Sequence, residues 1–177
     1  MKQIGGFTLI ELMITLAVAV IVLALGIPAF NAMLANNRAS AQANSLVTAL
    51  AFARSEAAKR GLRVALCPRD APGQADFSCG GRNDWVNGWM VFTDASGKAR
   101  RGYRPPQEDR LRLWPAPPGG HTVTASASSL GFSGSGELDK GAGVLFRIRF
   151  SKCTGAQNRD LRVHPAGRVE VTRISCP

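Results

Sequence analysis

The chain has 177 residues, with 22 Lys and Arg against 12 Asp and Glu, a formal net charge of +10 at pH 7. The apolar fraction of 45% is normal for a folded domain and argues against a disordered polar chain. The sequence has no internal period, which excludes tandem-repeat, collagen-like and coiled-coil proteins. Only two histidines are present, so the chain has few candidate residues for a histidine-based catalytic or metal site.

The first predicted element is a membrane-spanning helix. The segment Phe7–Phe30 is almost continuously apolar and contains one charged residue, Glu11. A helix of this length would extend about 36 Å, enough to cross a hydrocarbon core of about 30 Å. A secretory signal peptide is the alternative, but the apolar stretch is too long and no small-residue cleavage site follows before Pro28. Lys2 would keep the N-terminal end cytoplasmic and place most of the chain outside.

Glu11 is the unusual residue of this segment. A charged side chain buried without a partner at the bilayer centre costs about 2.5–3.5 kcal/mol on insertion scales. We therefore expect a positive group on a neighbouring subunit to pair with it. The alternative is an interfacial glutamate that reaches the lipid headgroups.

The residues around Glu11 form a specific pattern. It is Gly5-Gly6-Phe7-Thr8-Leu9-Ile10-Glu11, behind a short leader and ahead of the apolar helix. This pattern resembles the class III signal of type IV prepilins and type II secretion pseudopilins. The resemblance implies that a prepilin peptidase removes the leader, residues 1–6, by cutting after Gly6, and methylates the new amino terminus on Phe7. It also implies that Glu11 neutralises the terminal amine of an adjacent subunit during filament assembly.

The helical pattern continues past Pro28. Apolar residues fall mostly at three- and four-residue steps, at Phe30, Leu34, Leu46, Leu50, Ala53 and Ala57. Gly61 is a typical helix stop. We expect one helix from about Thr8 to Arg60, bent near Gly26 and Pro28. Residues 7–30 would lie in the membrane or filament core, and the amphipathic residues 31–61 would pack on a sheet.

From Leu62 onward the apolar period changes to two, which predicts short strands separated by glycine-rich turns. Without intervening helices such strands form an antiparallel sheet. Residues 62–177 would therefore be a β-rich head, with an exposed loop at Tyr103–Asp109, and the fold class is α+β. The predicted strands are Leu62–Cys67, Trp89–Thr93, Leu111–Trp114, His121–Ala125, Val144–Phe150, Leu161–His164 and Val169–Ile174.

The four cysteines, Cys67, Cys79, Cys153 and Cys176, lie beyond the membrane segment. In an oxidising periplasm they would form two disulfides, for which three pairings exist. The pairs Cys67–Cys79 and Cys153–Cys176 are favoured because each closes a local loop, contributing about 3 kcal/mol. A zinc site is the alternative, but the spacings contain no C-x-x-C pair.

The head contains a second group of motifs. They are Cys67-Pro68, Cys79-Gly80, Trp85, the segment from Gly88 to Asp94, Leu130-Gly131-Phe132-Ser133 with Gly136, and Gly167-Arg168. Together they resemble the FimT/FimU minor pilins and the related GspH pseudopilins of type II secretion. The resemblance implies a type IV pilin-like fold in a single-pass inner-membrane protein with a periplasmic head. It also implies assembly with other minor and major pilins into a filament or its tip.

No group of residues predicts catalysis. His121 and His164 are far apart in sequence, and neither has metal-ligand spacing. The glycine-rich segments 134–136 and 141–143 lack both a following helix and a G-K-[ST] sequence, so they do not predict a phosphate loop. Trp85, Trp89 and Trp114 are expected to be core or loop anchors rather than stacking platforms. We therefore expect no enzyme activity, no metal, no cofactor and no small-molecule substrate.

A basic surface is the one candidate binding site in the head. Arginines contact phosphates through forked donors, in a sequence-independent and salt-sensitive manner. In the FimT branch, DNA uptake is attributed to a C-terminal G-R-x-R segment, of which Gly167 and Arg168 match the first half. Glu170 replaces the second arginine and could pair with Arg168, and Arg173 could substitute for it. Candidate contacts to double-stranded DNA are Arg147, Arg149, Lys152, Arg162, Arg168 and Arg173.

A second basic cluster comprises Lys98, Arg100, Arg101, Arg104, Arg110 and Arg112. The alternative to DNA binding is a solvated basic face, or one that meets other minor pilins. The sequence thus predicts a minor pilin that helps prime type IV pilus assembly, with DNA capture for natural transformation as an added hypothesis. A GspH-type pseudopilin of type II secretion is the alternative.

Overall fold

The computed structural model describes residues 8–71, 78–95, 109–118, 120–139, 141–151, 153 and 155–177. Several predictions therefore fall outside the described residues. They concern the processing site at Gly6 and Phe7, residue Lys152, the loop at 103–108, and the basic residues Lys98, Arg100, Arg101 and Arg104.

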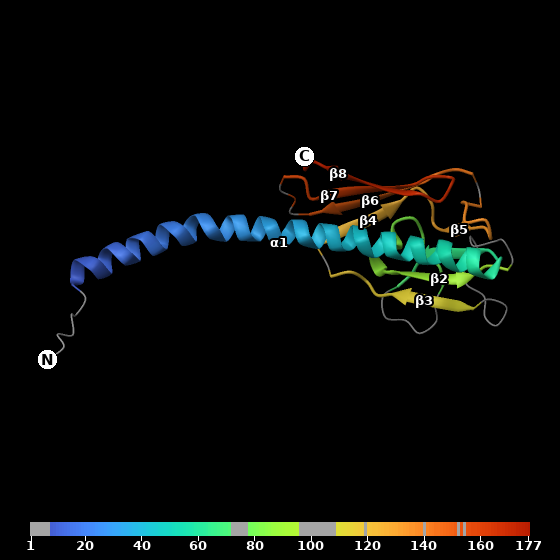
Figure 1. The fold of residues 1–177 in the computed structure, drawn as a ribbon, viewed down its shortest axis with the longest axis horizontal. Coiled ribbons are helices and arrows are strands. Elements are labelled where there is room, and N and C mark those ends of the chain that lie inside the picture. The colour runs from blue at the N-terminus through green and yellow to red at the C-terminus, as the bar shows by residue number, and fades with distance from the viewer. Residues whose placement is uncertain are drawn as a thin grey trace. The chain divides into compact units, whose positions relative to one another are not determined.

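One long helix, α1 (Leu9–Arg60), confirms the predicted helix, and Pro28 lies inside it (Figure 1). Thr8 precedes its first turn and accepts a hydrogen bond from the backbone N–H of Glu11, at 3.3 Å. Gly61 follows its last turn with φ of 62°, a left-handed conformation that suits glycine after a helix. The chain divides into two units after Asn37, and each is described by itself.

The first unit contains the N-terminal part of α1. Its large apolar side chains are exposed throughout, including Leu16, Leu25 and Phe30. This helix is long and apolar enough to cross a membrane, with a mean hydropathy of 2.7 over its most apolar stretch. The predicted limits of the spanning part, residues 7–30, stay a prediction.

The second unit has two four-stranded antiparallel sheets (Figure 1). Sheet 1 has the order β3 (Arg110–Trp114), β2 (Trp89–Thr93), β1 (Val64–Pro68) and β5 (Leu130–Phe132). Sheet 2 has the order β4 (His121–Ala125), β6 (Val144–Phe150), β7 (Asn158–Val163) and β8 (Val169–Ile174). The antiparallel strands were predicted, but their division between two sheets was not.

Two short elements went unpredicted. Strand β5 has three residues centred on Gly131, too few to show a period of two. A 3₁₀ helix, η1 (Asp84–Asn87), follows the first disulfide loop. Strand β7 also begins at Asn158 rather than at Leu161, because its first residues are polar and carry no apolar signal.

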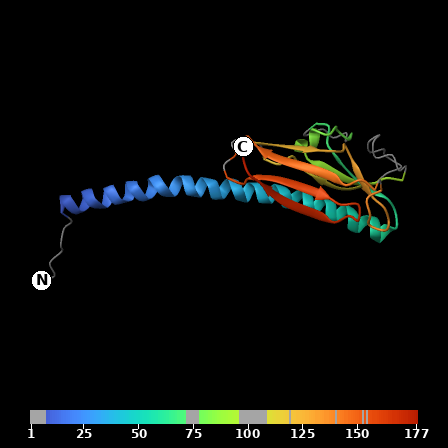
Figure 2. The same ribbon diagram turned by 90° about the horizontal axis from the view of Figure 1, so that it is seen from above.

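The core lies between the C-terminal part of α1 and both sheets (Figure 2). Leu46 and Leu50 of the helix are buried as predicted. They share one cluster with residues of sheet 1, such as Leu66, and of sheet 2, such as Phe146. The other buried helix residues in this cluster are small, which lets the strands approach the helix closely, and they are Ala43, Ala49, Ala53 and Ala57.

The three tryptophans are buried, as expected for core anchors. Trp85 on η1 packs edge-on against Phe146 of sheet 2, with ring centres 4.8 Å apart. Its indole N–H donates to the carbonyl of Ala127 at 3.2 Å. Trp114 of sheet 1 contacts Phe52 of α1, with ring centres 5.8 Å apart.

Two disulfides, Cys67–Cys79 and Cys153–Cys176, confirm the favoured pairing. Cys67 is fully buried on the face of sheet 1 that also carries Met90 and Phe92. The second disulfide joins the chain end beyond β8 to the segment before β7. The backbone N–H of Cys176 also donates to the carbonyl of Gly155 in that segment, at 2.8 Å. Among the described residues no cluster of His, Cys, Asp or Glu could hold a metal ion.

The turn between β7 and β8 is fixed to the helix through Gly167. Its φ is 78°, and an added Cβ would lie 2.4 Å from the carbonyl oxygen of Gly136 and 2.9 Å from Nε of Arg54. Arg54 of α1 also donates from Nη1 to the carbonyl of Gly167 at 3.4 Å. Only glycine satisfies both the backbone conformation and this close approach.

We predict that Gly167→Ala lowers the free energy of unfolding by about 3 kcal/mol or more, because a left-handed alanine is strained and its Cβ also collides with the Gly136 carbonyl. Gly155→Ala is the matched control, since Gly155 has φ of 68° but no atom of the described residues within 4 Å of an added Cβ. It should cost only about 1–2 kcal/mol. Urea unfolding of the full-length chain in detergent, followed by tryptophan fluorescence, measures both. Equal losses would contradict the role of the close approach.

Candidate functional site

Glu11 lies in the first turn of α1. Its side chain is exposed and has no ion-pair partner within the part of the chain that the structure describes. A carboxylate in the first turn of a helix is favoured by the positive end of the helix dipole. The predicted partner, the terminal amine on Phe7, belongs to a residue outside the described ranges.

The outer face of sheet 2 carries part of the predicted basic set. Because side chains alternate along a strand, Phe146 and Ile148 face the core while Arg147 and Arg149 face away. Arg149 is held in place: its Nη2 lies 2.6 Å from Oδ1 of Asp160, and its Nη1 donates to the carbonyl of Arg159 at 3.1 Å. The charge of Arg149 is therefore largely compensated.

Arg147 and Arg162 are exposed on the same outer face. Arg147 lies opposite Asp160 in the register of β6 and β7, and Arg162 lies opposite Glu170 in the register of β7 and β8. Neither arginine forms an ion pair within 4 Å with any residue that the structure describes. Their guanidinium groups are available to an external anion.

The β7–β8 turn brings Arg168, His164 and Glu170 together. Nε2 of His164 lies 3.0 Å from Oε2 of Glu170 and 3.5 Å from Nη2 of Arg168. The hydrogen bond from His164 lowers the pKa of Glu170 below its usual 4.5, helped by the charges of Arg168 and Arg162. Glu170 thus contacts His164, and no ion pair of Glu170 with Arg168 occurs among the described residues.

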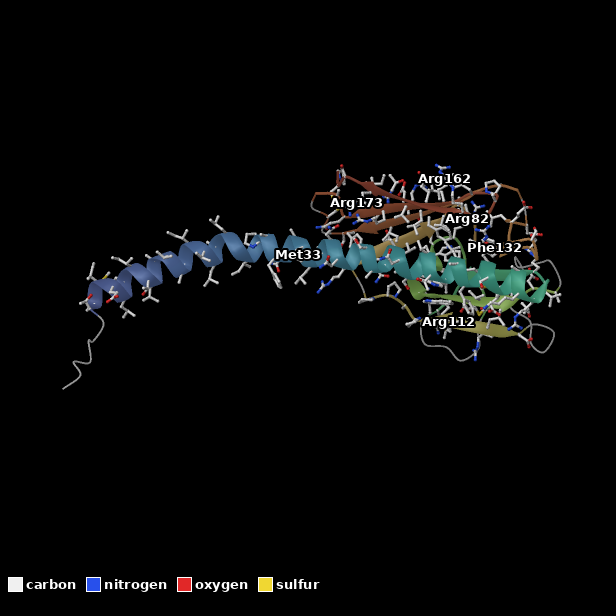
Figure 3. The ribbon with its side chains drawn as sticks, in the orientation of Figure 1. Met33, Arg82, Arg112, Phe132, Arg162 and Arg173 are labelled. Atoms are coloured by element: carbon white, nitrogen blue, oxygen red, sulfur yellow. A yellow bond between two sulfur atoms is a disulfide. The ribbon has the colours of Figure 1, made fainter. Side chains whose placement is uncertain are left out.

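Arg173 lies on a different face of sheet 2 from Arg168. In the register of β7 and β8 it lies opposite Arg159, on the inner face of sheet 2. Arg159 is buried there and donates to the carbonyls of Ala156 and Asn158, at 2.6 Å and 3.0 Å. Burial, and then the charge of Arg173, lower the pKa of Arg159. Figure 3 shows Arg173 and Arg162 well apart along the sheet.

The described part of the second basic cluster consists of Arg110 and Arg112 on β3. The guanidinium of Arg112 lies over the ring of Trp114, with its carbon 4.7 Å from the ring centre. It also lies 5.6 Å from the ring centre of Phe52. Arg112 therefore covers an aromatic pair at the edge of the core by cation–π contact.

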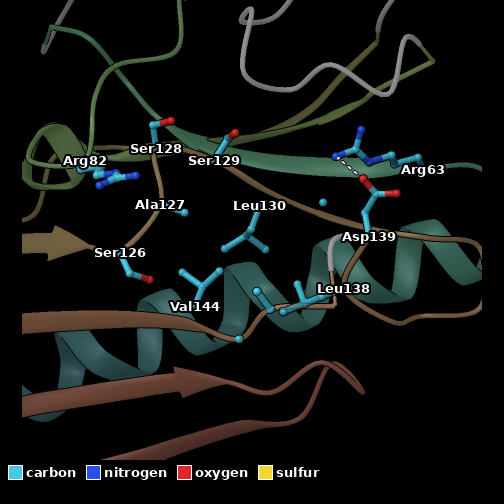
Figure 4. Close-up of a pocket in the computed structure, with 13 residues that line it drawn as sticks. Arg63, Arg82, Ser126, Ala127, Ser128, Ser129, Leu130, Leu138, Asp139 and Val144 are labelled. Atoms are coloured by element: carbon cyan, nitrogen blue, oxygen red, sulfur yellow. Dashed lines mark ion pairs between the residues drawn. The ribbon is translucent and has the colours of Figure 1, made fainter.

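A pocket of about 500 Å³ lies where the two sheets meet (Figure 4). Its apolar part is formed by Leu130, Leu138 and Val144. Arg63 lies at one end, with Nη2 3.0 Å from Oδ2 of Asp139 and Nη1 2.7 Å from Oδ2 of the buried Asp94. This pocket could not be predicted from residue patterns, because its residues come from five separate segments of the chain.

Two family models match the chain. Residues 42–167 match the family described as type II transport protein GspH. Residues 1–27 match the prokaryotic N-terminal methylation motif.

The chain belongs to the GspH family.

Two crystal structures of the type IV minor pilin FimU from Pseudomonas aeruginosa share this fold. The first is 21% identical, with a TM-score of 0.57, and the match covers 78% of this chain and 99% of FimU. The second is 20% identical, with a TM-score of 0.54, and covers 85% of this chain and 98% of FimU. A search of curated protein sequences found no match.

These findings confirm the resemblance to the FimT/FimU and GspH group and the pilin-like fold. GspH-family proteins are structural, non-enzymatic subunits, so this chain is not an enzyme. The family implies contacts with other pilins in a pilus or pseudopilus, and the apolar N-terminal helix indicates membrane anchoring. The processing and assembly roles of Gly6, Phe7 and Glu11 stay predictions.

The contact between His164 and Glu170 generates a pH prediction. The carboxyl carbon of Glu170, followed by NMR, should titrate with a midpoint below 4.5, because His164 and two arginines favour the charged form. A carboxyl pKa lowered by folding adds stability above the unfolded value and loses it as the pH falls through the folded value. His164→Ala should move the midpoint back toward 4.5. The control Arg147→Ala should leave the midpoint unchanged. If His164→Ala has the same midpoint as the wild-type protein, His164 is not the cause of the lowered pKa of Glu170.

Proposed function

We propose that this protein is a minor type IV pilin that takes part in priming pilus assembly from the inner membrane. The observation that carries the proposal is the position of Glu11 in the first turn of an exposed apolar helix, within the methylation motif. The likeness of the fold to a minor pilin, FimU, supports it. The head would be periplasmic, and the subunit would enter the filament or its tip.

The proposed chemistry begins with removal of residues 1–6 by prepilin peptidase, which cuts after Gly6 and methylates Phe7. The new amine is positive, and Glu11 of an adjacent subunit is negative. Pairing the two in an apolar filament core offsets the cost of leaving either charge alone in hydrocarbon. The exposed apolar side chains of α1 would be covered at the same time by the helices of neighbouring subunits.

Glu11→Gln should reduce the amount of this subunit in sheared surface filaments by at least about tenfold, because an amide cannot neutralise the neighbouring amine. The membrane-bound amount should stay the same, since glutamine is no harder to insert than glutamate. Quantitative immunoblots of the two fractions measure this. Glu137→Gln, an equivalent change in the head, is the control. Normal incorporation of Glu11→Gln would overturn the assembly role.

A pseudopilin of the type II secretion system is the alternative assembly. The family description as a type II transport protein favours it, and the proposed chemistry of Glu11 would be the same. Deletion of the gene separates the two. Loss of piliation and twitching supports the minor pilin, whereas loss of protein secretion with normal piliation supports the pseudopilin.

We also propose that the outer face of sheet 2 captures double-stranded DNA for natural transformation. The specific observation in its favour is that Arg147, Arg162 and Arg168 are exposed, while Glu170 is occupied by His164. Arginines on an exposed sheet can contact successive phosphates without reading sequence. The proposed surface leaves out Arg149, whose charge Asp160 compensates, and Arg173, which lies on the other face.

Arg168→Gln should weaken DNA binding by the full-length protein several-fold, because one phosphate contact is lost. The slope of log K against log salt concentration should fall in magnitude by about one. Arg173→Gln removes the same charge from the inner face and should change neither quantity. Fluorescence anisotropy with a labelled duplex at several salt concentrations measures both. Equal effects of the two substitutions, or no binding at low salt, would refute this surface.

A further inference from the structure

The pocket between the two sheets combines groups that the proposed assembly does not use. Its volume of about 500 Å³ is within the range of ligand-binding pockets, about 300–1,000 Å³. Leu130, Leu138 and Val144 form its apolar floor and are buried in the core. The floor is therefore rigid, because these side chains are packed on both sheets and on α1.

One end of the pocket offers hydrogen-bond donors. Arg82 lines this end, and its exposed guanidinium has no ion-pair partner within the described ranges. The backbone around it is fixed, since the carbonyl of Arg82 accepts a hydrogen bond from the N–H of Ala125 at 3.0 Å. Ser128 and Ser129 line the same pocket, and their hydroxyls have no partner among the residues that the structure describes. A guanidinium without an ion-pair partner favours an anionic group, and a carboxylate is the anionic group that a peptide carries.

The other end offers an acceptor. Asp139 uses Oδ2 for Arg63, while its Oδ1 has no partner among the described residues, and a third of the side chain is exposed. Arg63 is locked between Asp94 and Asp139 and packs on Gly131, where an added Cβ would lie 2.6 Å from its guanidinium. The Arg63 side chain is therefore held in place and cannot fold over the pocket. Oδ1 of Asp139 can accept a hydrogen bond from a cationic group.

Figure 4 shows Arg82 and Asp139 at opposite ends, with Leu130 and Val144 between them. The α-carboxylate and the α-ammonium of a free amino acid share one carbon, so these two charges cannot lie at opposite ends of the pocket. An extended peptide can reach both ends, because its alternate side chains point to one side. An acidic, an apolar and a basic side chain at successive alternate positions would match the three parts of the pocket.

We propose that this pocket receives an extended peptide segment of a neighbouring pilin subunit, with a carboxylate at Arg82, an apolar side chain on Leu130 and Val144, and a basic side chain at Asp139. That the segment belongs to a neighbouring subunit rests on the proposed assembly. The predicted binding of a peptide to the pocket does not depend on that assembly. The binding test below and the Glu11 experiment can therefore fail independently.

The test uses the full-length protein in detergent and two blocked pentapeptides, Asp-Ser-Val-Ser-Lys and its reverse, which allow for either chain direction. Titration calorimetry should show binding of one of them. Replacing its Asp by Asn should weaken binding by about tenfold, and replacing its Lys by Gln should also weaken it. In Arg82→Gln the Asp and Asn peptides should bind equally. Arg173→Gln, a matched loss of an exposed arginine, should keep the discrimination.

Three results would overturn the proposal. The first is that neither peptide binds at about 10 mM. The second is that Arg82→Gln still prefers the Asp peptide. The third is that acetate or free lysine binds as tightly as the pentapeptide, which would assign the pocket to small molecules.

Discussion

The head depends on one constraint: a stripe of small and branched apolar residues on α1 must be buried by two sheets at once. Leu46 and Leu50 are almost fully buried, and burial of each contributes about 1.5–3 kcal/mol. Ala49 and Ala53 beside them have small side chains, so strands of both sheets can pack close to the helix. Neither sheet has another apolar element of this length to cover it in the described chain. The helix that anchors the protein is therefore also the centre of its core.

The positions of the candidate sites follow from this packing. Because α1 packs on the inner face of sheet 2, the exposed arginines of β6 and β7, Arg147 and Arg162, lie on its outer face, and Arg168 lies at the β7–β8 turn. Arg54 on α1 and the glycine at 167 fix that turn, which in turn fixes Arg168 beside His164. The pocket arises because both sheets pack on one helix yet separate between β5 and β6, where Leu130 and Val144 line the opening.

Much of this fold could be predicted from residue patterns, because the patterns report which face of an element is buried. The apolar period of two predicted the strand Val144–Phe150, and the loop lengths favoured the observed disulfides. Patterns do not report which strands pair, so the division into two sheets was missed. The contact of His164 with Glu170 was missed for the same reason. It needs the register of the β7–β8 hairpin, which also places Arg173 away from Arg168.

The excess of arginine over lysine also has a structural cause. Of the 22 basic residues 17 are arginine, and several hold the fold together through donors that lysine cannot direct. Arg63 joins two carboxylates, Arg149 joins a carboxylate and a carbonyl, and Arg159 binds two carbonyls in the core. The net charge of the chain therefore overstates what an external polyanion can bind. The arginines that remain for a partner are those whose strand position turns them away from carbonyls and carboxylates, and on sheet 2 register rather than composition selects them.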